Sequence, residues 1–161
     1  ILLARTSLLL APLILQICLS DMLYSATYDI NPVAASRPRV TTKGHSYYSG
    51  PYKKFRTDMK ELTKGLTKEF IPLVGPLVVD LDLYVQKPKN TKLFSPRGDV
   101  DNYVKAVLDQ FNKVLWEDDA QITVIYAMKA WTSSNEEEGW FDISVEQDQN
   151  FTQLENGTWV I

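Results

Sequence analysis

Residues 97–105, RGDVDNYVK, lead into a run of helical spacing that ends before residues 116–121, WEDDAQ. Gly98 gives the turn before this run its conformational freedom, and Asp99 or Asp101 is placed to cap the helix. Apolar residues recur at intervals of three and four and predict one buried stripe, which comprises Val100, Val104, Val107, Leu108, Phe111 and Leu115. The rest of the chain is expected to be a scaffold that brings the two stretches together.

Both stretches carry acidic side chains beside apolar elements. Asp99 and Asp101 lie two residues apart and would point the same way in an extended segment. Asp118 and Asp119 form a second acidic pair. Carboxylates are hard oxygen ligands of the kind Mg²⁺ prefers, and at least two must converge to hold the ion beside a phosphate. Lys105 stands one helical turn after Asp101, where its ammonium can meet a phosphate oxygen. This set predicts a metal-dependent site that cleaves phosphodiesters.

Each of these residues also has a purely structural interpretation. An aspartate at a helix start is commonly a cap. Lys105 and Asp101 at i,i+4 can form an ordinary surface ion pair worth about 0.3–0.5 kcal/mol. Asp118 and Asp119 can form the turn between a helix and a strand. The combination of four acids and a lysine in two segments favours the metal site.

The order Asp-x-Asp-Asn-x-x-Lys at residues 99–105, followed by Asp-Asp-Ala-Gln at residues 118–121, closely resembles the signature of RusA-type Holliday-junction resolvases. These crossover junction endodeoxyribonucleases are common in phages and prophages. Upstream, Arg-Pro-Arg at residues 37–39 and Tyr-Lys-Lys-Phe at residues 52–55 are similar to segments seen in many phage members. The similarity covers about residues 22–146. The leader and the acidic tail lie outside it.

The resemblance implies particular roles for the motif residues. Asp99, Asp101 and Asp119 would be metal ligands, with Asp118 in support, and Lys105 would be essential to catalysis. The activity implied is a Mg²⁺-dependent, structure-selective endodeoxyribonuclease that resolves four-way DNA junctions by paired symmetric nicks in recombination and repair. Mn²⁺ is the substitute ion to test. One or two ions would activate water and stabilise the departing 3′ oxygen.

Two symmetric nicks need two sites, so a homodimer is the expected assembly, and the resemblance implies it as well. Four-way junction DNA is the expected partner. Neither a membrane nor a small-molecule cofactor is expected. The expected location is the cytoplasm of a bacterium or of a phage-infected cell.

The charge of the chain is −3 in total but is unevenly spread. Residues 37–68 contain nine Lys and Arg against two acids, whereas residues 135–161 contain seven acids and no Lys or Arg. A basic face for DNA is therefore compatible with an acidic total. Positive charge interleaved with rings suits phosphates and exposed bases. The residues expected to bind DNA are Arg37, Arg39, Lys43, Tyr48, Lys53, Lys54, Arg56 and Lys60.

Hydrophobic periodicity predicts a single α/β (α+β) domain, and 161 residues with 45% hydrophobic content are enough for one core. Strands are expected at residues 23–30, 77–85, 121–131 and 140–146, and helices at residues 51–70 and from about residue 99 onward. The order is β-α-β-α-β-β, which indicates a mixed sheet with two helices packed on it. Residues 33–50 are expected to be a loop or arm, and residues 148–161 a weakly ordered acidic tail.

Residues 1–21 are mostly apolar and have the composition of a signal peptide or weak anchor. Met22 opens the expected domain of residues 22–147, so we expect a start at Met22 and regard the leader as upstream translation. If the leader is used, the chain is exported, and Asn150 and Asn156 become glycosylation sites in a eukaryotic host. The single cysteine, Cys18, lies in the leader, and a single histidine, His45, excludes a histidine cluster.

Two other classes of function remain open. A non-catalytic module that binds branched DNA would keep the basic residues but would tolerate neutral residues at Asp99, Asp101 and Asp119. An exported, Ca²⁺-stabilised binding domain would need the leader and the glycosylation sites to be used. The joint presence of the aspartates favours the nuclease.

Overall fold

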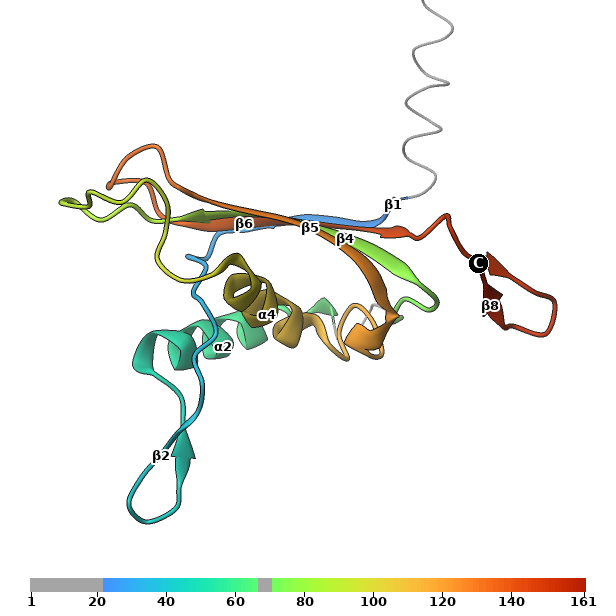
Figure 1. The fold of residues 1–161 in the computed structure, drawn as a ribbon, viewed down its shortest axis with the longest axis horizontal. Coiled ribbons are helices and arrows are strands. Elements are labelled where there is room, and N and C mark those ends of the chain that lie inside the picture. Colours follow the sequence, from blue (N-terminus) through green and yellow to red (C-terminus); the bar gives the residue numbers. More distant parts are fainter. Residues whose placement is uncertain (1–21, 67–70) are drawn as a thin grey trace, which may run out of the picture.

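The computed structural model describes residues 22–66 and 71–161, and a four-stranded sheet organises them. The strand order is β1-β6-β4-β5, in which β4 and β5 are parallel and the other neighbours are antiparallel. The strands are β1 (Met22–Tyr28), β4 (Leu77–Val85), β5 (Ile122–Trp131) and β6 (Trp140–Gln147). Helices α2 (Gly50–Leu62) and α4 (Val100–Phe111) lie on one face of this sheet (Figure 1). The predicted mixed α/β fold with two helices on a mixed sheet is confirmed.

Three smaller elements complete the described chain. Strands β2 (Arg39–Val40) and β3 (Ser46–Tyr47) form a hairpin that projects away from the sheet, within the predicted arm (Figure 1). A 3₁₀ turn, η1 (Asp119–Gln121), precedes β5. Strands β7 (Thr152–Gln153) and β8 (Trp159–Val160) form a second hairpin. No helix in residues 22–66 and 71–161 is long and apolar enough to cross a membrane, and the apolar leader lies outside these residues.

The C-terminal hairpin is a difference from the weakly ordered tail that the sequence predicts. Its anchor is Trp159, whose ring lies against Gly75. Gly75 has φ +87°, and a β-carbon there would collide with the ring. The aromatic ring therefore holds the tail against the segment that leads into β4.

Helix α2 is shorter than the predicted helix at residues 51–70. Thr63 is its C-cap residue, and the backbone N–H and the hydroxyl of Thr63 both donate to the carbonyl of Met59, each at 2.9 Å. Leu62, the last residue of α2, is 51% exposed and gains little from burial. A helix is stabilised mainly by packing of its apolar face, so α2 lacks this support at its last residue. Residues 67–70 lie outside the described part of the chain.

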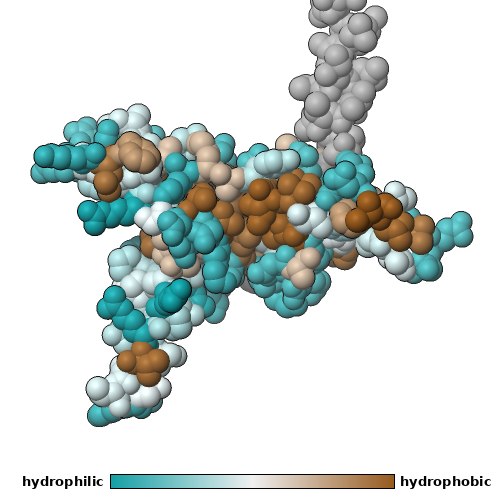
Figure 2. All heavy atoms as spheres, viewed as in Figure 1, coloured by the Kyte–Doolittle hydropathy of each residue, from teal (hydrophilic) through white to brown (hydrophobic). Residues whose placement is uncertain are grey.

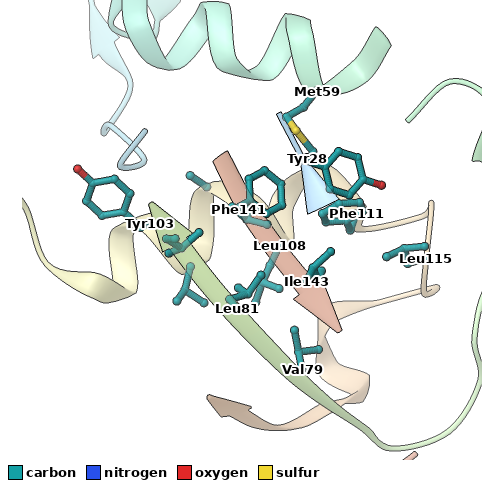
Figure 3. Packing of buried hydrophobic residues seen from close by; sticks show 14 of the residues in the cluster. Tyr28, Met59, Val79, Leu81, Tyr103, Leu108, Phe111, Leu115, Phe141 and Ile143 are labelled. Carbon is teal, nitrogen blue, oxygen red and sulfur yellow. The ribbon is translucent and has the colours of Figure 1, made fainter. Parts of the chain in front are cut away.

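Alternating side chains of β4 form the centre of the core. The buried residues of this strand are Leu77, Val79, Leu81, Leu83 and Val85. Against them, α2 contributes Tyr52, Phe55 and Met59, α4 contributes Val104, Val107, Leu108 and Phe111, and β6 contributes Phe141, Ile143 and Val145 (Figure 3). The predicted stripe of α4 also includes Val100, which is 39% exposed because it faces an open pocket rather than the core.

Within residues 22–66 and 71–161, no helix covers the opposite face of the sheet, and this face is acidic. Asp80 and Asp82 point there from β4, as the alternation predicts, and Asp142 of β6 lies opposite Asp82 in the register. Burial, together with the charges of Asp80 and Asp142, raises the pKa of Asp82. The hydroxyl of Thr27 donates to Asp142 at 2.5 Å. This face therefore concentrates negative charge on the side away from the helices.

Asp148 joins the ends of three strands. Its carboxylate accepts a hydrogen bond from the Thr123 hydroxyl at 2.5 Å and from the Asn150 backbone N–H at 2.9 Å. Its own N–H donates to the carbonyl of Pro76 at 3.0 Å. The hydrogen bond from Thr123, followed by that from Asn150, lowers the pKa of Asp148 below its ordinary value of 3.8. The ionised form is therefore the one that the fold stabilises.

The Asp148→Asn variant should unfold at a lower urea concentration than the wild type near neutral pH, because the amide is a weaker acceptor than the carboxylate. The pKa of Asp148 is lower in the folded state, so its contribution is complete above the unfolded value of 3.8 and is lost as the pH falls through the folded pKa. The two stability curves should therefore converge as the pH falls below the folded pKa. Urea unfolding followed by tryptophan fluorescence measures this, with Glu155→Gln as control. A gap that is constant over the whole pH range would contradict the assignment.

Candidate functional site

A pocket of about 450 Å³ lies between α4 and the edge strand β5. Its apolar wall consists of Val100, Val104, Leu108, Ile125 and Ala127, and its polar groups are Asp101, Lys105, Asp109 and Asp119. Figure 2 shows apolar side chains exposed across the middle of the molecule, where β5 runs in Figure 1. The structure thus places three of the predicted site residues around one pocket, namely Asp101, Lys105 and Asp119. Asp99 and Asp118 are not among its lining residues.

Asp101 and Asp119 lie at opposite ends of this pocket. The Lys129 ammonium, near the end of β5, donates to the carbonyl of Gly98 at the start of α4. Asp119 instead precedes Ile122, the first residue of β5, and the strand from Ile122 to Lys129 spans about 23 Å. Within residues 22–66 and 71–161, no three acidic, histidine or cysteine side chains are close enough to hold a metal ion together. The four aspartates expected as ligands are therefore not gathered into one group by a single copy.

Asp99 and Asp101 have different local roles from those that the spacing predicts. Asp99 is the N-cap residue of α4, yet its side chain makes no capping hydrogen bond. Asp101 lies inside the helix rather than in an extended segment, and its Oδ1 accepts the Asn102 N–H at 2.9 Å. Both residues are exposed. Neither carboxylate is therefore committed to capping the helix.

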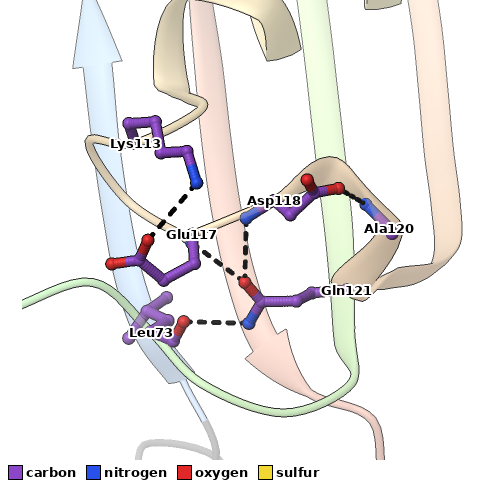
Figure 4. A network of polar contacts seen from close by, with 6 residues as sticks. All are labelled: Leu73, Lys113, Glu117, Asp118, Ala120 and Gln121. Carbon is purple, nitrogen blue, oxygen red and sulfur yellow. Dashed lines mark hydrogen bonds and ion pairs between the residues drawn. The ribbon is translucent and has the colours of Figure 1, made fainter.

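Asp118 is held by a capping box that involves Gln121 (Figure 4). Asp118 Oδ1 accepts the Ala120 N–H at 2.9 Å, and Gln121 Oε1 accepts the N–H groups of Glu117 and Asp118 at 2.9 and 3.1 Å. The Gln121 amide also donates to the carbonyl of Leu73 at 2.9 Å. Gln121 thus fixes the acidic turn, a role that the sequence reasoning missed. Its position three residues after Asp118 is the spacing that signals a capping box.

Asp119 is the aspartate that is best placed to take a cation. The residue is half-buried, and its Oδ1 is fully buried without a hydrogen-bond partner. A buried carboxylate oxygen without a hydrogen-bond partner costs free energy, and its lone pairs can instead coordinate a divalent cation. Mg²⁺ commonly takes one or two carboxylates and completes its shell with water and substrate phosphates. The donor set at this end of the pocket therefore fits Mg²⁺.

Lys105 pairs with Asp109 rather than with Asp101. The distance from Lys105 Nζ to Asp109 Oδ1 is 3.3 Å, and 66% of the lysine side chain is exposed. Asp109 also accepts the Tyr52 hydroxyl of α2 at 3.4 Å. Burial, followed by the negative charge of Asp109, raises the pKa of Tyr52 to about 12, so the phenol remains a donor. Such an exposed ion pair is weak, so the ammonium can leave it for a phosphate oxygen.

The residues expected to bind DNA separate into two groups. Arg37, Arg39 and Lys43 are exposed on and beside the projecting hairpin, and Lys53, Arg56 and Lys60 line a groove between α2 and α4. The other two residues are already engaged by neighbouring side chains. Lys54 pairs with Asp58. Tyr48 is half-buried, and the Arg56 guanidinium covers its ring at 4.8 Å from the centroid, where a base would have to stack.

A mixed α/β domain with carboxylates and a lysine around one pocket at the sheet edge has the composition of a metal-assisted phosphodiesterase. The family model described as endodeoxyribonuclease RusA matches residues 29–138, which is more than half of the chain. The chain therefore belongs to the RusA endodeoxyribonuclease family, and the resemblance of its motif is confirmed. Membership implies endonuclease activity toward Holliday junctions.

The chain is also similar to a protein of Bacillus subtilis (strain 168). The uncharacterized protein YqaN is 30% identical to this chain over an alignment of 117 residues, and the match covers 63% of this chain and 82% of YqaN. The similarity therefore extends well beyond the acidic motif.

Mn²⁺ or Mg²⁺ should raise the Tm of the full chain, because an ion that binds only the folded state stabilises it by about 2.7 kcal/mol at 100 times its Kd. Asp119→Asn should remove most of this rise. Asp118→Ala should lower the Tm without metal, because the cap of η1 is lost, but should keep most of the rise. Thermal unfolding with and without the ion measures both effects, with Asp80→Asn as control. An equal rise in the wild type and in Asp119→Asn would place the ion elsewhere.

Proposed function

We propose that this chain is a structure-selective, Mg²⁺-dependent endodeoxyribonuclease that resolves four-way DNA junctions by paired symmetric nicks. The observation that supports this most directly is the pocket between α4 and β5, which both acidic stretches and Lys105 enter. Family membership supports the class of reaction. The protein would act in recombination and repair, in the cytoplasm of a bacterium or a phage-infected cell.

Each motif residue has a proposed role. Asp99, Asp101 and Asp119 would hold Mg²⁺, and Asp118 would support Asp119 by fixing its turn. The bound ion supplies an activated water and stabilises the departing 3′ oxygen. The Lys105 ammonium would exchange the carboxylate of Asp109 for a phosphate oxygen and would counter the charge that develops there.

A homodimer explains how the separated carboxylates can act together. β5 is an edge of the sheet, and it exposes Ile125, Tyr126 and Met128. Antiparallel pairing of β5 from two copies around a twofold axis would put the start of one strand beside the end of the other. Asp119 of one copy would then approach the partner's Asp101. We therefore propose that each of the two sites takes Asp99 and Asp101 from one copy and Asp119 from the other.

The full chain with Mg²⁺ should place two symmetric nicks in a synthetic four-way junction and none in a linear duplex or in EDTA. Asp101→Asn and Lys105→Ala should each slow cleavage by at least about 100-fold, because each removes a group that acts at the reacting phosphate. Both variants should still bind the junction, and Asp80→Asn should cut normally. Mapping the nicks on sequencing gels measures this. Tight binding without cutting, in Mg²⁺ or Mn²⁺, would instead identify a junction-binding module.

Mixing two inactive variants tests the shared site. Asp101→Asn and Asp119→Asn should each be inactive as homodimers, but a mixed dimer contains one intact site, made from Asp119 of the first variant and Asp101 of the second. Co-refolding the two variants should therefore restore single nicks, with up to half of the dimers active. The control is co-refolding of Asp101→Asn with Lys105→Ala, which leaves no intact site. No recovery in the first mixture would mean that each copy builds its own site.

A further inference from the structure

A second concave surface lies between α2 and the end of α4, with a volume of about 920 Å³. Its lining is strongly basic. The cations are Lys53, Arg56, Lys60, Lys64 and Lys113, and the acids are Glu61 and Asp109. We call this surface the α2–α4 groove. Lys53, Arg56 and Lys60 step by three and four residues along one side of α2, so they face the same way.

The opposite wall of the groove supplies another cation. Lys113 belongs to the turn after α4 and has φ 67°, which is rare for a residue other than glycine. It pairs with Glu117 at 3.4 Å, but both side chains are more than 60% exposed, at 69% and 62%. Such a pair contributes little, so the ammonium is available to a stronger anion. Cations therefore face the groove from both sides.

The groove adjoins the pocket between α4 and β5. Asp109 lines both of them, and the same residue holds Lys105. α4 is thus the shared wall between a basic groove and the site proposed for cleavage. A polyanion that reaches Lys105 has a basic path onward past Asp109.

We propose that the α2–α4 groove holds the phosphate backbone of one DNA strand as it leaves the cleavage pocket. This inference rests on the proposed function, because the strand is the one that is cut. Lys53 and Lys60 are about 10 Å apart along the helix, so they can meet two different phosphates of one strand. The stacking of Arg56 on Tyr48 holds its guanidinium in place before DNA arrives. Backbone contacts of this kind set the position of the strand without reading its sequence.

The groove assignment differs from a general attraction of DNA to positive charge. It excludes Lys54, which neighbours Lys53 in sequence but pairs with Asp58 outside the groove. It includes Lys64 and Lys113, which are not among the eight residues that the sequence analysis gives as binding DNA. The proposal therefore predicts that a lysine contributes to DNA binding only if it lines the groove, whatever the total number of lysines on the surface.

The test measures the Kd of the full chain for a four-way junction in EDTA at several salt concentrations. Lys60→Ala and Lys113→Ala should each weaken binding and reduce the slope of log Kd against log salt by about 0.7–1. Lys89→Ala, which removes an exposed lysine from a loop outside the groove, is the matched control and should keep the slope. Replacing single phosphates beside the nick with methylphosphonates should weaken wild-type binding, and Lys60→Ala should lose this sensitivity at one of them.

The outcomes separate the groove from the proposed function. Equal losses in Lys60→Ala, Lys113→Ala and Lys89→Ala would overturn the groove, because the effect would then be general electrostatics. Normal junction cleavage by the wild type with unchanged slopes in the groove variants would also overturn it and would leave the nuclease intact. Lower slopes in the groove variants of a protein that never cuts would support the groove and would overturn the nuclease.

Discussion

The parallel pairing of β4 with β5 is the constraint on which the rest of the structure depends. Parallel neighbours cannot be joined by a tight turn, so the chain must cross over the sheet, and α4 is that crossing. The same helix covers the β4 core with one side and bounds the pocket and the basic groove with the others. The two acidic stretches flank α4 in sequence. The crossover therefore places them at the two ends of β5, although they are close together in the chain.

The sequence predicts the parts of the fold that depend on one segment. The strand at residues 77–85 is correct to the residue, because its strict alternation places every second side chain in the core. The predicted end of the first helix is wrong. The sequence predicts a helix to residue 70, but α2 ends at Leu62, because the end depends on whether another element covers Leu62. The ion-pair partner of Lys105 also depends on another element. Asp101 and Asp109 both lie four residues from Lys105, so the spacing does not predict which of them pairs with it. Tyr52, which holds Asp109, comes from another helix.

The acidic turn also has a feature that the sequence does not predict, namely the different surroundings of two neighbouring aspartates. Asp118 and Asp119 are neighbours with the same chemistry, so their order in the sequence does not separate their roles. The capping box separates them, because it engages Asp118 and leaves Asp119 Oδ1 buried without a partner. The spacing from Asp118 to Gln121 was visible in the sequence. The burial of one carboxylate oxygen was not, since it depends on how the turn docks between α4 and β5.

The acidic face of the sheet, which carries Asp80, Asp82 and Asp142, lies opposite the face that the helices cover. A polyanion that approaches from the acidic side meets repulsion, while one that approaches from the helical side meets the cations of α2. The sheet thus separates two surfaces of opposite sign. The electrostatic field would therefore orient DNA toward the helices before any contact forms. Encounters with the acidic face would be brief, and encounters with the basic face would be favoured.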